Sequence, residues 1–69
     1  MSPEEKEYLK MKDEISDDVR GLFEAYLKVF DWDIPEDDDK KAASLVLKAI
    51  KEAVEQIEED VKNGKYNNF

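Results

Sequence analysis

Apolar residues recur every three or four positions along two long segments, and this spacing limits the chain to helices. The first series consists of Tyr8, Met11, Ile15, Val19, Leu22, Tyr26 and Val29, and the second of Ala43, Leu47, Ile50, Val54, Ile57 and Val61. Steps of three and four keep side chains on one face of an α-helix, with charged residues on the other face. The sequence therefore predicts a single small all-α domain. Its expected parts are a helix over about 3–31, an acidic hinge over 31–36, a helix over about 36–63 and a short tail over 64–69.

Capping residues indicate where both helices are expected to begin and end. Ser2 and Glu5 match a capping box, in which each side chain accepts a hydrogen bond from the backbone of the other residue. Asp33 and Glu36 have the same spacing and predict a second capping box at the start of the second helix. Gly64 suits the position just after a helix, because glycine tolerates the left-handed backbone that is common there.

Two residues could interrupt the first helix. Ser16, which two aspartates follow, has the features of an N-cap. Gly21 costs about 1 kcal/mol relative to alanine in a helix interior, unless a close helix crossing requires it. The apolar series keeps its phase across both residues, and this favours one continuous helix, straight or bent. The alternative is a break near Ser16 that leaves three shorter helices.

Two helices alone form one seam and leave half of each wide apolar stripe in water. The first expectation is an antiparallel hairpin of two long helices that completes a four-helix bundle by dimerisation. A monomer of three shorter helices is the alternative. The length of 69 residues favours association. Domains below about 70–80 residues usually need a disulfide, a metal or a partner, and this chain has neither cysteine nor histidine.

The residue types exclude most catalytic chemistry. Without histidine or cysteine, the chain has no thiol nucleophile, no imidazole base and none of the usual zinc ligands. The Asp-rich hinge does not fit a calcium loop, because Pro35 and Glu36 occupy positions that need a ligand and a glycine. Glu52 and Glu55 could share a metal ion in a metal-dependent hydrolase, but they lie beside lysines on the solvated face. We expect no catalytic residues, no metal and no cofactor, and the hydrolase is the least favoured alternative.

The charge balance predicts the kind of partner and the compartment. Nineteen acidic and eleven basic residues give a formal net charge of −8. This charge argues against direct binding to nucleic acid or to an anionic membrane, and it favours a basic protein surface. Residues 1–15 have no apolar run typical of a signal peptide. No apolar stretch approaches the roughly 20 residues that span a bilayer. We therefore expect a cytoplasmic protein.

The hinge and the residues that follow it carry more acid than a helix cap requires. Trp32, the only tryptophan, is expected to cover the end of the core beside Phe30, or else to stand exposed as an interface anchor. The candidate partner-binding residues are Asp31, Trp32, Asp37, Asp38 and Asp39.

Two functions are consistent with these features. The first is a non-enzymatic, acidic protein–protein interaction module. In its sharpest form it is an inhibitor that imitates nucleic acid and blocks the basic surface of a nucleic-acid-binding enzyme. The alternative is a structural, self-assembling helical bundle module whose charge serves solubility. The abundance of glutamate and lysine and the absence of threonine are also typical of designed helices, so this module could be designed or redesigned.

Overall fold

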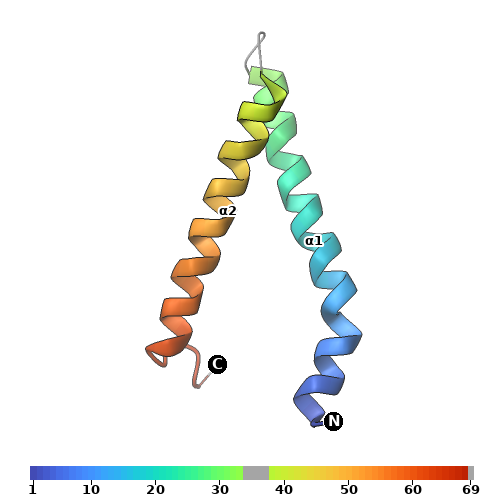
Figure 1. The fold of residues 1–69 in the computed structure, drawn as a ribbon, viewed down its shortest axis with the longest axis vertical. Helices are drawn as coiled ribbons and strands as arrows, with labels where there is room; N and C mark the ends of the chain where they lie inside the picture. Colours follow the sequence, from blue (N-terminus) through green and yellow to red (C-terminus); the bar gives the residue numbers. More distant parts are fainter. Residues whose placement is uncertain (34–37, 69) are drawn as a thin grey trace.

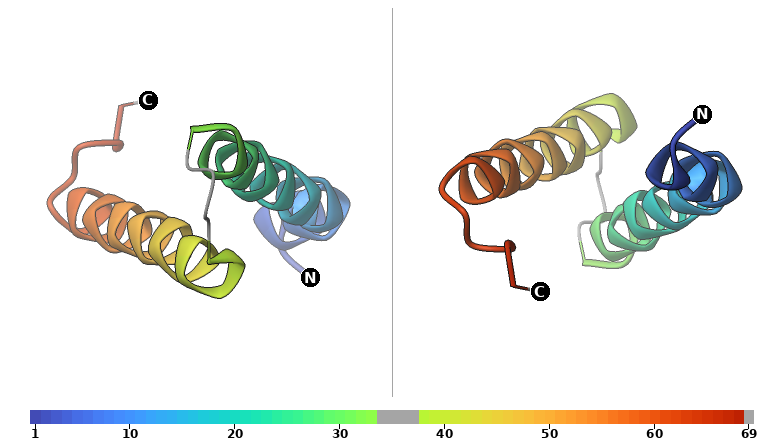
Figure 2. Two further views of the ribbon diagram at one scale, coloured as in Figure 1. Left: turned by 90° about the horizontal axis from the view of Figure 1, so that it is seen from above. Right: turned by 90° about the horizontal axis from the view of Figure 1, so that it is seen from below.

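The chain forms two antiparallel helices joined at one end. The computed structural model describes residues 1–33 and 38–68. Helix α1 spans Pro3–Asp33 and helix α2 spans Asp39–Lys62. The helices meet beside the connection and diverge toward the termini, so the molecule has the shape of a V (Figure 1). Views from above and below show the same divergence (Figure 2). The prediction of an all-α helical hairpin is confirmed.

Helix α1 is continuous through both residues that could have interrupted it. The helix runs without a break from Pro3 to Asp33, so the favoured prediction of one continuous helix is confirmed, and the alternative of a break near Ser16 with three shorter helices is wrong. Gly21 does not mark a close helix crossing either, because a Cβ atom added there would meet nothing within 4 Å. The unbroken phase of the apolar series explains the result, since one straight face outweighs a local capping signal.

The start of α1 has the predicted capping box. The backbone N–H of Glu5 donates to Ser2 Oγ at 3.1 Å, and the backbone N–H of Ser2 donates to Glu5 Oε1 at 3.3 Å. Two backbone donors that the helix leaves unpaired are thereby satisfied.

The second predicted capping box is wrong. Asp33 is the last residue of α1, so this helix extends two residues beyond the end predicted at 31. Asp38 caps α2 instead, and the first helical residue is Asp39 rather than residue 36. Glu36, the other half of the predicted box, lies outside the described residues. An acidic run offers several possible caps, and the sequence spacing alone did not select the right one.

Helix α2 ends as predicted at a glycine. Gly64 has a φ angle of +81°, in the left-handed region. The backbone N–H of Gly64 donates to the Val61 carbonyl at 3.1 Å, and that of Lys65 donates to the Asp60 carbonyl at 3.0 Å. These two bonds form the Schellman motif. The following residues continue as turns up to position 68.

The hairpin has almost no core. Among the described residues, Ala42 and Val46 alone are buried apolar residues, at 2% and 7% exposure. The accessible surface is 6488 Å², whereas a folded monomer of 8.1 kDa is expected to expose about 4,500 Å². The radius of gyration is 16.0 Å, against about 11 Å for a compact chain of this length. Neither described helix has a stretch apolar enough, over the length that a bilayer requires, to cross a membrane.

Candidate interaction surfaces

An apolar groove of about 490 Å³ separates the two helices. It lies between the diverging helices, and its lining runs from Phe30 and Leu45 near the connection to Val19 and Ile57 farther away. Side chains from both helices line it, and every one of them is apolar or tyrosine. The lining consists of Val19, Leu22, Tyr26, Phe30, Leu45, Val46, Ala49, Ile50, Ala53, Val54 and Ile57.

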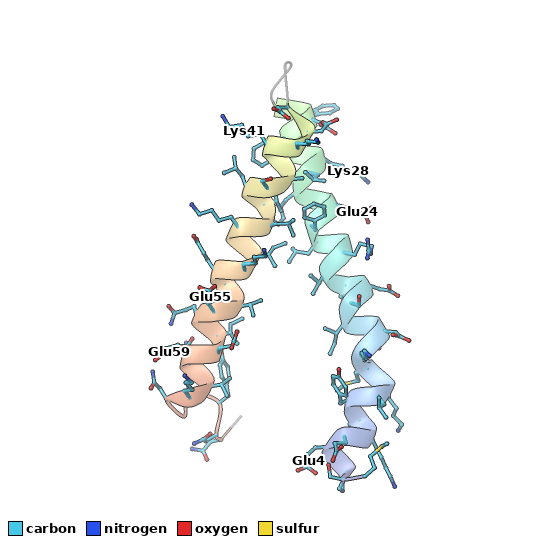
Figure 3. All side chains as sticks on the ribbon, in the orientation of Figure 1. Glu4, Glu24, Lys28, Lys41, Glu55 and Glu59 are labelled. Atoms are coloured by element: carbon cyan, nitrogen blue, oxygen red, sulfur yellow. The ribbon has the colours of Figure 1, made fainter. Side chains whose placement is uncertain are left out.

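The groove follows from the register of the two apolar stripes. Tyr26 lies seven residues before the end of α1, and Val46 lies seven residues after the start of α2, so the two stand at the same height. Because α1 and α2 run in opposite directions, each turn of one stripe then faces a turn of the other. Charged side chains occupy the outer sides. Figure 3 shows Glu24 and Lys28 pointing outward from α1, and Glu55 and Glu59 pointing outward from α2.

The predicted acidic residues are divided between the two helix ends. Asp31 lies exposed in the last turn of α1, and Asp39 is the exposed first residue of α2. Asp38 is the N-cap of α2, and its carboxylate accepts hydrogen bonds from the backbone N–H groups of Lys40 and Lys41 at 3.1 and 3.2 Å. Asp37 lies outside the described residues. Capping therefore accounts for at least one carboxylate that was assigned to partner binding.

Trp32 is exposed rather than buried. Its exposed fraction is 89%, so the expectation that it covers the end of the core is wrong. The reason is its position on the helix. Trp32 follows the groove-lining Phe30 by two residues, a rotation of about 200° that directs it to the opposite side of α1. The indole therefore projects from α1 away from the groove.

We expect Asp38→Ala to destabilise the helical fold by about 1 kcal/mol, because two backbone donors lose their acceptor. Asp38→Asn should cost much less, since the asparagine side chain retains an acceptor oxygen. Urea unfolding monitored by circular dichroism compares the two variants. Equal losses for both would indicate that the charge matters and that the cap does not.

Sequence reasoning placed the candidate site at the acidic hinge and did not treat the groove as a site. Five lining residues lie outside the two predicted apolar series, namely Phe30, Leu45, Val46, Ala49 and Ala53. The signal for these faces was the width of the apolar stripes, which one helix–helix seam cannot cover and which had already predicted dimerisation. Among the residues that the structure describes, no group of three or more acidic side chains is placed to hold a metal ion.

Comparison with known proteins identified no similar protein. No family model matches the chain, and neither a curated protein nor a solved structure matches it.

Proposed function

We propose that this chain is a non-enzymatic helical interaction module, and that two copies associate through their grooves to complete a four-helix bundle. The exposed apolar lining of the groove carries this proposal. Side chains such as Val54, which is 49% exposed, lie on the inner face of a helix and have little to pack against in a single hairpin. A second hairpin supplies two further helices of the same pattern.

The surface area supports an extensive contact. The chain exposes about 2,000 Å² more than a compact monomer of its mass. If two copies cover this excess on each other, the interface buries about 4,000 Å² in total, within the range of obligate homodimers. The contact is isologous, because the same groove serves both copies.

Sedimentation equilibrium at micromolar concentration tests the proposal. We expect twice the mass of the single chain. We also expect the dimer to become tighter as salt is added, since each copy carries a net charge of −8 and salt screens the repulsion. A strict monomer that keeps its full helical content would contradict the proposal.

A second candidate function is binding of a basic protein surface by the acidic residues beside the connection, such as Asp31 and Asp39. In its sharpest form this module inhibits a nucleic-acid-binding enzyme. The exposure of Trp32 beside Asp31, on the side of α1 away from the groove, favours it. An exposed aromatic residue within a charged surface is typical of an interface anchor. Such binding weakens as salt is added, so the salt dependence distinguishes it from dimerisation.

A further inference from the structure

Two opposite charges interrupt the apolar inner faces. Lys12 lies four residues after Tyr8 and three before Ile15, so it belongs to the apolar face of α1. Asp60 lies three residues after Ile57 and continues the face of α2 in the same way. Most other charged residues lie on the outer faces, where water solvates them. A charge within an apolar stripe is costly unless it meets its opposite.

Lys12 and Asp60 stand at the same height in the hairpin. Lys12 is 21 residues before Asp33, the end of α1, and Asp60 is 21 residues after Asp39, the start of α2. At a rise of about 1.5 Å per residue, both lie about 32 Å from the connection. In the single hairpin this is the part of the V where the helices have diverged (Figure 1).

The two charges have different surroundings in the single hairpin. The Asp60 carboxylate accepts a hydrogen bond from Gln56 Nε2 at 3.2 Å and lies 3.6 Å from Lys65 Nζ, and its side chain is 23% exposed. Lys12 is exposed, and no ion pair joins it to another residue in 1–33 or 38–68. An acidic side chain is thus partly desolvated on one inner face, and an ammonium without an ion pair lies at the same height on the other.

We propose that the Lys12 and Asp60 side chains of the two copies form one charged layer in the dimer. This layer fixes the register of the four-helix bundle. The inference rests on the proposed self-association. A shift of register would place the Lys12 ammonium against apolar residues without an ion-pair partner, and it would leave the Asp60 carboxylate with Gln56 and Lys65 alone. A single polar layer in a helical bundle specifies register in this way.

Charge reversal with sedimentation equilibrium tests the layer. Lys12→Glu and Asp60→Lys should each weaken dimerisation about tenfold, and the double variant should recover to within about threefold of the wild type. Matched controls are Lys28→Glu and Glu59→Lys, which make the same charge changes on the outer faces. Each control should shift the dissociation constant by less than about threefold.

The double variant separates the layer from a local role of Asp60. Asp60→Lys also removes the contact with Lys65, and Lys12→Glu cannot restore that contact. If the losses of affinity in the two single variants simply add in the double variant, the inference of a charged layer is overturned. The proposal that the wild type dimerises is not affected by that outcome. A monomeric wild type would overturn the inference together with the proposed function.

Discussion

Replacing Val54 with aspartate is expected to dissociate the dimer without burying a charge in the single chain. Val54 lines the groove and is 49% exposed in one chain, so a carboxylate there stays solvated in the monomer. In the bundle the same carboxylate is covered by apolar side chains of the second copy. Leaving a charge buried without a partner costs about 3 kcal/mol or more, which corresponds to a loss of affinity of about 100-fold or more.

Ser44→Asp is the matched control for Val54→Asp. It adds the same charge to the same helix, but Ser44 lies on the outer side of α2 with Lys48 and Lys51. Sedimentation equilibrium of both variants should show a monomer for Val54→Asp and a dimer for Ser44→Asp. If Val54→Asp dimerises as well as the wild type, the groove is not the interface.

Dilution of the wild type should remove most of its helical structure. The single hairpin buries about 45% of the surface of the unfolded chain, whereas a domain of this size usually buries about 60%. Two isolated helices with so few buried contacts have little tertiary packing to stabilise them. If the proposed dimer forms, we expect helix formation to depend on association, and the midpoint of thermal unfolding should rise with protein concentration.

Circular dichroism measures this effect over a dilution series from high to low micromolar concentration. Val54→Asp serves as the reference, because its signal should already be low at the highest concentration. A helical signal and an unfolding midpoint that do not change with concentration would show that the hairpin is stable alone. In that case association would not be linked to folding.

The fold was largely predictable because long periodic segments carry a strong signal. The apolar series from Tyr8 to Val29 continues in phase past Ser16 and Gly21, and the helix does the same. The caps at Ser2 and Gly64 were also predictable, because each position has one candidate with the right neighbours. Helical periodicity and cap hydrogen bonds depend on residues a few positions apart. The sequence alone is therefore enough to predict these features.

The helix ends and the cap between Asp31 and Asp39 were not predictable to the same degree. Between Asp31 and Asp39 the chain offers several carboxylates, and any of them could cap a helix. The choice of Asp38 over Asp33 depends on how far α1 continues, a question that sequence spacing left open. The exposure of Trp32 has the same origin, since the indole turns away from the groove only because α1 remains helical up to Asp33.

The few buried contacts near the turn lie close to the start of α2, the point about which this helix would tilt. Val46 lies seven residues from the start of α2, and Lys62, the last residue of that helix, lies sixteen residues farther on. With a rise of about 1.5 Å per residue, a tilt that moves the helix by about 1 Å near Val46 moves its far end by about 3 Å. Small side chains at Ala42 and Val46 thus govern the width of the open end. A side chain enlarged at Val46 would therefore move the far end of α2 about three times as far as it moves the helix beside it.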